Sequence, residues 1–337
     1  MKIKSLISNG LLVAVSIAVT AAVIEYGTRL LYPALIPSGH LRFVKGEGDM
    51  PTLGPRNARL RQIKNTGDFD VAVNFNKYGF RDSKNLDESE PGDYFLVGDS
   101  LSIGWGVEED ERYSNLVQAA LKRRVFNLSA PGDIDGFEKV LNYAKKNDAK
   151  ITKLLLAISM AVNMKNFEKK AGENPAPGPG PGIIARLKPI LMTNSAFYFL
   201  VTSFVHKNEP LKMKAIELGL INPNLEGIAH KPYSRENIES MTRRAVRLAE
   251  KYDTTIIIGH SRGLWFGTEE EKKTAWRIHK AVLDRFSEMG LKVVDVGQAF
   301  GEDDDPKKNY FVNDGHWSPK GHGTAARAII KHLKAKD

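Results

Sequence analysis

The chain has 337 residues, of which 42% are hydrophobic and 26% charged, so it is long enough for one large or two ordinary globular domains. Its 49 basic and 40 acidic residues give a net charge of +9, which favours anionic surroundings; no basic run alternates with aromatic residues, and nucleic acid is not an expected partner. The absence of cysteine excludes disulfides, thiolate metal ligands and a cysteine nucleophile.

The N-terminal segment predicts contact with a membrane. Lys2 and Lys4 precede residues 6–24, a stretch without charge that forms about 30 Å of helix. We expect residues 1–30 to be an uncleaved anchor, with the lysines on the cytoplasmic side and the rest of the chain outside the cytoplasm. A cleaved signal peptide stays open as an alternative, because the most apolar part, residues 11–24, is short and Val19-Thr20-Ala21 resembles a cleavage site.

After an extension at residues 31–92, short apolar runs alternate with helical patterns, which is typical of parallel strands buried on both faces. The extension itself contains one alternating stretch, "DVAVNFNKYGFRD", that predicts a strand followed by a turn. The expected main domain, residues 93–337, is a doubly wound, flavodoxin-like, three-layer α/β/α domain with a mainly parallel five-stranded sheet. Its strands are "YFLVG", "RVFNLS", "KLLLAIS", "TTIIIGH" and "LKVVDVG", and its helices lie at about 113–124, 136–146, 235–252, 270–289 and 319–334.

One connection is much longer than the others and predicts an insertion at about residues 165–232. Residues 172–182 are too rich in Pro and Gly for a helix or a strand ladder, and "SAFYFLVTSFV" is too short to span a membrane. The insertion is either a surface excursion with one packed helix or a lid or acceptor-binding element beside the site.

Two serines follow apolar strands, Ser100 in "FLVGDSLSIG" and Ser261 in "IIIGHSRG". The G-x-S-x-G pattern around Ser261 is typical of a nucleophile turn that passes directly into a helix, but here the next helix begins only near Gly267 and Thr268. Few residues remain after Ser261 for an acid and a base. We therefore interpret Ser261 as a strand-end residue, with His260 or Arg262 near the rim of the site.

Ser100 is followed, in chain order, by the other parts of a nucleophilic site. Gly132 follows the second strand and brings a backbone N–H close to a reacting oxygen, and Asn163 follows the third strand and offers an amide donor. Asp314 and His316 stand in "NDGHWSPKGH" near the C-terminus. A serine hydroxyl needs a base to take its proton, and the base needs an acid to hold its tautomer.

These stretches resemble the SGNH (GDSL) hydrolase superfamily, most strongly in "GDSLSIGWGV" and "NDGHWSPKGH", and "NKYGFRD" resembles a lead-in of membrane-anchored bacterial members. The resemblance implies that Ser100 is the nucleophile, His316 the base and Asp314 its acid, with an oxyanion hole formed by the Ser100 and Gly132 amides and Asn163. It also implies a location in the bacterial inner membrane, as a single-pass protein with a periplasmic catalytic domain.

Two positions depart from the family pattern. The aspartate usually found three residues before the histidine is Asn313 here, and the D-x-H-W spacing of Asp314 is similar to SGNH proteins of polysaccharide and peptidoglycan O-acetylation. Asn163 is followed by Met164 instead of aspartate, so Asn166 competes for its role. Of the neighbouring polar residues, we expect Asp99 to organise the turn, Ser102 to cap a helix and His322 to be structural.

The expected activity is ester hydrolysis or O-acyl transfer through an acyl-serine, with an ester-bearing cell-envelope carbohydrate or a small acyl ester as the substrate. The alternative is a protein that keeps the fold without catalysis and binds a glycan or acts as a scaffold in an envelope complex. The sequence has no metal-ligand spacing, no G-x-G-x-x-G and no Walker pattern, so it predicts no cofactor and no metal.

Overall fold

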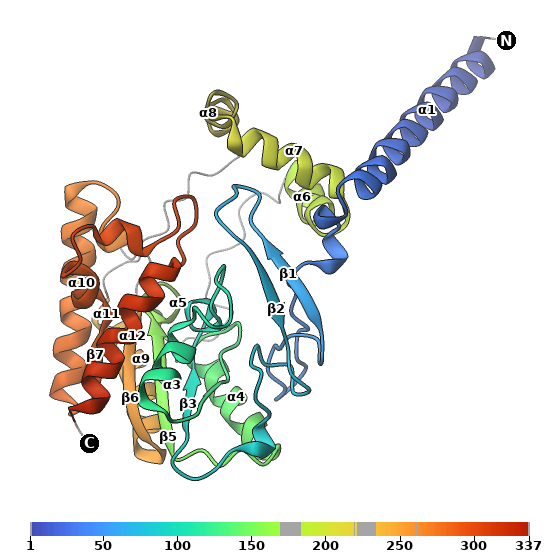
Figure 1. Ribbon diagram of the computed structural model, residues 1–337. Helices are drawn as coiled ribbons and strands as arrows, with labels where there is room; N and C mark the ends of the chain where they lie inside the picture. Colours follow the sequence, from blue (N-terminus) through green and yellow to red (C-terminus); the bar gives the residue numbers. More distant parts are fainter. Residues whose placement is uncertain (1, 169–182, 219, 221–233, 260–261, 336–337) are drawn as a thin grey trace. The chain divides into compact units, whose positions relative to one another are not determined.

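The computed structural model describes residues 2–168, 183–218, 220, 234–259 and 262–335 (Figure 1). The chain divides into two compact units. The smaller unit takes its described residues from Met1–His40, Lys64–Gly67 and Pro175–Asn222, and the larger unit takes them from Leu41–Ile63, Asp68–Asn174 and Pro223–Asp337. The larger unit therefore includes most of the extension before residue 93, while part of the insertion is in the smaller unit with the N-terminal helix.

A parallel five-stranded sheet forms the centre of the larger unit, in the order β4-β3-β5-β6-β7. Its strands are β3 (Tyr94–Val97), β4 (Val125–Asn127), β5 (Lys153–Ser159), β6 (Asp253–Gly259) and β7 (Val293–Asp295). Along the chain, the sheet begins with β3, adds β4 at one edge and then continues on the other side of β3 with β5, β6 and β7, which is the doubly wound, flavodoxin-like arrangement. The fold class predicted from the sequence is confirmed.

Helices cover both faces of this sheet, because alternate side chains of each buried strand point to opposite faces. One hydrophobic core joins the sheet to α4 (Ile134–Lys146), α9 (Arg235–Lys251) and α10 (Glu269–Glu288). The other joins it to α3 (Tyr113–Leu121), α11 (Val296–Gly301) and α12 (Pro319–Lys334). Five of these six helices begin and end within a few residues of the predicted ranges; α11, a short helix directly after β7, was not predicted.

The extension forms an antiparallel pair of strands, β1 (Arg59–Ile63) and β2 (Asp70–Asn74). The alternating stretch "DVAVNF" explains β2, since Val71 and Val73 are buried while their neighbours are exposed. The following turn closes with a hydrogen bond from the Gly79 amide to the Asn76 carbonyl (3.0 Å). Phe80, just after this turn, is buried in the core that contains α4, so the extension is part of the larger unit's interior.

The smaller unit contains α1 (Lys2–Leu31), α6 (Ile183–Asn194), α7 (Ala196–Lys207) and α8 (Glu209–Glu217). Within the described residues, one helix is long and apolar enough to cross a membrane, at Asn9–Leu31 with a mean hydropathy of 1.9. "SAFYFLVTSFV" forms most of α7, with Ser195 as its N-cap. The Pro- and Gly-rich stretch at 172–182 lies outside the described residues.

Candidate active site

Ser100 lies at the carboxyl end of β3, where the chain turns sharply into the short helix α2 (Ser100–Ile103). Asp99 is the N-cap of α2, and its Oδ1 accepts a hydrogen bond from the Leu101 amide (3.1 Å). The turn requires glycine at position 98, because a Cβ there would lie 2.4 Å from the Ser102 hydroxyl and 2.9 Å from Ala157 of β5. The sequence "GDS" therefore lets α2 pack closely on the sheet and leaves Ser100 half-buried at its edge.

Ser100, His316 and Asp314 form a continuous chain of hydrogen bonds. The Ser100 Oγ lies 2.8 Å from His316 Nε2, and His316 Nδ1 lies 2.5 Å from Asp314 Oδ1. Asp314 Oδ1 also accepts the backbone amide of His316 (3.0 Å). The imidazole thus has one nitrogen toward a carboxylate and the other toward a hydroxyl, which is the geometry in which a base takes a serine proton.

The residues around Asp314 and His316 hold their loop in place. Trp317, next to His316, is almost completely buried among side chains of α3, α11 and α12. The backbone carbonyl of His316 accepts a hydrogen bond from the Phe311 amide (3.1 Å). Asn313, which occupies the position where the family usually has aspartate, donates its backbone amide to Asp68 Oδ1 (3.0 Å). The tryptophan of "DGHW" therefore anchors the loop beside the sheet.

Arg262 supports the same loop from the end of β6. It is buried in the short 3-10 helix η5 (Arg262–Leu264), and its guanidinium donates to the carbonyls of Asp314 (3.4 Å) and Val312 (3.2 Å). Its guanidinium carbon also lies 4.0 Å from the centre of the Phe266 ring. The expectation that Arg262 lies near the site agrees with these contacts, and its contribution is to position the backbone that carries Asp314.

Trp105 is a part of the site that our reading of the sequence missed. Its indole stacks on the His316 imidazole, with ring centres 5.2 Å apart and planes inclined by 22°. The loop that carries it begins at Gly104, whose φ of +83° favours glycine, and a Cβ there would lie 2.3 Å from Arg112. The only signal in the sequence was an aromatic residue between two glycines in "IGWGV", five residues after Ser100.

The loop after α2 is tied to the extension by Arg81 of "NKYGFRD". Its buried guanidinium donates to the carbonyls of Gly104, Val107 (2.6 Å) and Ala72 (3.0 Å). Arg112 in turn donates to the Arg81 carbonyl (2.5 Å). Burial and the neighbouring Arg112 charge lower the pKa of Arg81 to about 9, so the side chain still carries its charge at neutral pH. The lead-in motif is thus a structural clamp on the loop that presents Trp105.

The expected oxyanion donors lie at the carboxyl ends of neighbouring strands. Gly132 follows β4 and has a φ of +154°, a conformation that side chains rarely adopt. Asn163 is the last residue of the short helix α5 (Met160–Asn163), is completely buried, and accepts the Ile134 amide (2.8 Å) while it donates to the Ser159 carbonyl (3.0 Å). Those contacts use one Nδ2 hydrogen and leave the second without an acceptor among the described residues.

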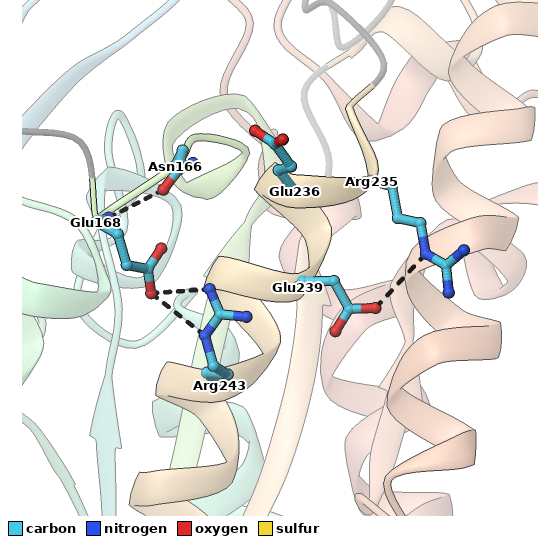
Figure 2. A pocket seen from close by; sticks show the side chains of 6 residues that line it. All are labelled: Asn166, Glu168, Arg235, Glu236, Glu239 and Arg243. Atoms are coloured by element: carbon cyan, nitrogen blue, oxygen red, sulfur yellow. Dashed lines mark hydrogen bonds and ion pairs between the residues drawn. The ribbon is translucent and has the colours of Figure 1, made fainter. Parts of the chain in front are cut away.

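Asn166, the competitor of Asn163, has a different environment. Its Oδ1 accepts the amide of Glu168 (3.0 Å), and its side chain lines a pocket of ≈ 350 Å³ at the start of α9 (Figure 2). Asn163 is fixed instead between the end of β5 and the start of α4. Of the two, Asn163 is the amide that the fold holds at the edge of the sheet.

Most side chains that line the pocket in Figure 2 are charged, and four of them form ion pairs with one another. The Glu168 carboxylate accepts hydrogen bonds from Arg243 and from the Ser240 hydroxyl. Arg235 Nε lies 3.9 Å from Glu239 Oε1. The hydrogen bond from Ser240, with those from Arg243 and Arg244, lowers the pKa of Glu168 to about 2. The residues that line this pocket include neither Ser100 nor His316. The pocket is therefore separate from the Ser100, His316 and Asp314 side chains.

Three further polar residues have roles that differ in part from expectation. Asp99 was expected to organise the turn; it does so as the N-cap of α2, and its burial raises the pKa of the carboxyl. The prediction that Ser102 caps a helix is wrong: Ser102 lies inside α2 and its hydroxyl is 2.6 Å from that of Tyr113, because Asp99 already occupies the cap. His322 is buried in α12, where its Nδ1 accepts the Tyr113 amide (3.3 Å).

Ser261 and His260 lie outside the described residues. The elements on either side are described: β6 ends at Gly259, the short 3-10 helix η5 covers Arg262–Leu264, and the next α-helix, α10, begins only at Glu269, after a capping box made by Thr268 and Glu271. A strand-to-helix turn centred on Ser261 would need the helix to begin directly after it. No group of three or more metal-ligating side chains is found among the residues that the structure describes.

Comparisons with known proteins give one family match and several similar solved structures. The family described as "SGNH hydrolase-like domain, acetyltransferase AlgX" matches residues 266–337, a segment that contains Asp314 and His316 but not Ser100. No curated protein matches the chain.

Several solved structures are similar to the chain. They include a lipolytic protein of the G-D-S-L family from Veillonella parvula (15% identity, TM-score 0.38, 71% of this chain and 96% of that chain). A lipase/acylhydrolase from Enterococcus faecalis (13%, 0.38, 72% and 96%) and the acetylxylan esterase Axe2 from Geobacillus stearothermophilus (13%, 0.39, 74% and 96%) are comparable. Because these TM-scores are below 0.5, the fold is assigned from this chain's own strand order.

The strand order, the sharp turn after β3 and the family match together define the class: the chain resembles SGNH (GDSL) hydrolases and has an SGNH-like α/β fold. Within that class, the matched family is an acetyltransferase domain, over about the last fifth of the chain.

Proposed function

We propose that the protein is a serine-dependent ester hydrolase or O-acyltransferase that acts on acyl esters, such as acetyl esters, of a cell-envelope glycan. The observation that carries the proposal is the hydrogen-bonded chain from Asp314 through His316 to Ser100. A buried carboxylate, an imidazole and a half-buried hydroxyl in this order are the parts needed to make serine a nucleophile at neutral pH.

In the proposed reaction, Ser100 Oγ attacks the ester carbonyl while His316 Nε2 takes the hydroxyl proton. Asp314 stabilises the imidazolium that forms, and the Trp105 face lies against the same ring. The carbonyl oxygen becomes an oxyanion, for which the Ser100 and Gly132 amides and Asn163 Nδ2 are the proposed donors. His316 then returns the proton to the departing alcohol, which leaves an acyl group on Ser100.

The acceptor decides the name of the enzyme. Attack of water on the acyl-serine releases a carboxylic acid and makes the protein an esterase, whereas attack of a sugar hydroxyl moves the acyl group and makes it an O-acyltransferase. The match to an acetyltransferase domain supports the second route, and the acetylxylan esterase among the similar structures is compatible with the first. A glycan of the cell envelope as the substrate agrees with a chain that α1 holds in the inner membrane with the larger unit in the periplasm, which is part of the proposal.

The test compares two serine variants of the full-length protein in detergent, with p-nitrophenyl acetate as the acyl donor. We expect Ser100→Ala to lower kcat/KM by at least about 10³-fold, because the nucleophile is lost, and Ser261→Ala to keep activity near the wild-type value. A fluorophosphonate probe should label the wild type at Ser100, as located by peptide mass. The opposite pattern in the two variants would assign the reaction to Ser261.

The non-catalytic alternative makes a different prediction. If the protein only binds a glycan or scaffolds a complex, neither turnover nor fluorophosphonate labelling will occur although the protein is folded. Intact-mass measurement after incubation with an acyl donor, with and without a deacetylated glycan oligomer, separates the two enzymatic routes. A transferase leaves the acyl group on the glycan. An esterase releases it as a carboxylic acid and leaves the mass of the glycan unchanged.

A further inference from the structure

The helices α6, α7 and α8 of the smaller unit expose an unusual amount of apolar surface. Side chains of all three are more than a third exposed: Leu187, Ile190, Leu191, Met192, Phe197, Val201, Phe204, Leu211 and Met213. Phe204 alone is 63% exposed. The α7 sequence "AFYFLVTSFVHK" contains no acidic residue. Exposed apolar side chains in this number are typical of a contact surface.

The start of α7 is bound to the helix α1 of the same unit. The Glu25 carboxylate of α1 accepts hydrogen bonds from the Ser195 hydroxyl (2.7 Å) and from the amides of Ala196 (2.9 Å) and Phe197 (3.2 Å). Arg29, one turn further along α1, pairs with Glu25 (2.7 Å) and donates to the carbonyl that ends α6 (2.6 Å). These contacts attach the junction of α6 and α7 to one defined level of α1.

That level is the point where the apolar part of α1 ends. Residues 6–24 carry no charge, and Glu25 is the first charged residue after them. A carboxylate is costly inside a hydrocarbon layer, so a fully hydrogen-bonded Glu25 indicates the boundary of that layer. The exposed Tyr26 and Tyr32, at 73% and 50%, follow it, and tyrosines of this kind are enriched at membrane–water interfaces.

We propose that α6, α7 and α8 lie in the interfacial layer of the same bilayer that α1 crosses, with their apolar side chains among the upper acyl chains. The proposal rests on the membrane placement of α1 given above and goes beyond the proposed reaction. Helices that lie on a membrane bury their apolar side chains in the boundary between headgroups and acyl chains. In α8, the basic Lys212 and Lys214 are paired with Glu209 and Glu217, so these acidic side chains offset their charge.

The chain contains no cysteine, so single cysteines report one position each. We would place the dye NBD on Phe204→Cys and Ile190→Cys as test positions in the full-length protein. Ile17→Cys, 64% exposed on α1, is the positive control, and Met289→Cys, 42% exposed in the larger unit, is the matched apolar control. Each variant is reconstituted in phosphatidylethanolamine and phosphatidylglycerol vesicles that carry a doxyl quencher at a shallow or a deep acyl position. Hydrolysis of p-nitrophenyl acetate is measured for each variant as a check on folding.

We expect shallow doxyl lipid to lower the emission of the dyes at 190 and 204 by at least about twofold, and deep doxyl lipid to quench the dye at 17, in line with a burial of about 5–10 Å for interfacial helices. The dye at 289 should be quenched by neither. Quenching at 17 without quenching at 190 and 204 would overturn the interfacial placement and leave the anchor intact. A blue-shifted but unquenched dye at 204 would overturn it in favour of a protein partner, and no quenching at 17 would overturn the membrane placement as well.

Discussion

At the residue scale, the proposed triad depends on neighbours that do no chemistry themselves. Asp314 is held through the Arg262 guanidinium, His316 is followed by the buried Trp317, and Ser100 follows the cap residue Asp99. The polar atoms that react are therefore placed by side chains and carbonyls with few alternative positions. Such support is what keeps a catalytic geometry within the narrow range that proton transfer needs.

Trp105→Ala should weaken catalysis without removing the nucleophile. An aromatic face against an imidazolium contributes about 0.5–2 kcal/mol, so we expect kcat/KM to fall by roughly tenfold, with Trp105→Phe losing less. The rate of fluorophosphonate labelling should fall in parallel, since it also depends on activation of Ser100 by His316. Equal labelling rates in wild type and Trp105→Ala, with both proteins folded, would show that the stacked indole has no part in activation.

Gly132→Ala tests the proposed oxyanion donor. A Cβ at position 132 meets only the Gly136 Cα at 3.8 Å, so the cost of the change comes from the φ of +154° and not from a collision. Because strain at this position turns the Gly132 amide away, we expect kcat to fall by about 10²-fold. Gly136→Ala in α4 is the matched control, since a Cβ there meets only Asp133 Oδ1 at an ordinary contact distance of 3.9 Å, and the variant should keep kcat and keep or raise the melting temperature. Equal effects of the two substitutions on kcat would remove Gly132 from the proposed hole.

At the scale of elements, the packing of α12 on α3 contains a buried histidine. His322 Nδ1 accepts the amide at the start of α3, and the ring stacks on Tyr113 at 5.7 Å. Burial, together with the positive charges of Arg112 and Arg81 and of His316 when it is protonated, lowers the pKa of His322 to about 3. The folded protein therefore keeps this ring neutral, because a protonated Nδ1 cannot accept the hydrogen bond.

The stability of the protein should consequently fall as the pH falls below 6.5, the ordinary pKa of histidine. In that range the unfolded chain binds a proton at position 322 and the folded chain does not. The loss is about 1.4 kcal/mol per pH unit, or about 2 kcal/mol between pH 6.5 and about pH 5. Urea unfolding of wild type and His322→Gln at both pH values measures this loss of unfolding free energy. The other titrating groups affect both proteins equally, so the difference between the two proteins reports His322. An unchanged pH dependence in His322→Gln would show that this histidine is not the source.

Elements were predictable where a local pattern determined them. The unbroken apolar runs of β5 and β6 predicted two central strands of the sheet. The starts of α12 and α10, which follow the capping residues Ser318 and Thr268, agree with the predicted starts within a residue or two. The pair of strands in the extension was only half predicted, because β1 contains Arg59, Arg61 and Gln62 and has no apolar alternation. Its pairing with β2, including the Arg61 ion pair with Asp70, forms through contact across the hairpin.

At the scale of the whole molecule, the chain combines an α/β unit with a smaller helical unit that contains an apolar helix of membrane-spanning length. The association of α7 with α1 joins parts of the chain that are about half its length apart. It makes the insertion a companion of the N-terminal helix within that unit, with Glu25 as the shared acceptor. Whether α1 stays attached to the mature chain decides whether this unit exists in the cell.

We expect α1 to remain attached. The protein recovered from a bacterial membrane fraction should have the intact mass of residues 1–337 and should stay in the membrane during washes with about 1 M NaCl, because salt screens the electrostatic attraction of the +9 chain but not apolar insertion. A chain that begins near Ala22 would support the cleaved signal peptide. Release by salt alone would mean that charge, and not α1, holds the protein at the membrane.

The sequence by itself determined the sheet, the helices that flank it, the apolar N-terminal segment and the residue types of a nucleophilic site. These depend on local periodicity and on the position of a residue at the end of a strand. Only the tertiary structure decided that His316 reaches Ser100 across 216 positions and that Trp105 stacks on the imidazole. It also decided that Arg81 holds the loop that carries Trp105. Such contacts depend on how segments that are distant in the sequence pack together. The local periodicity of a segment does not indicate which distant side chain it will contact.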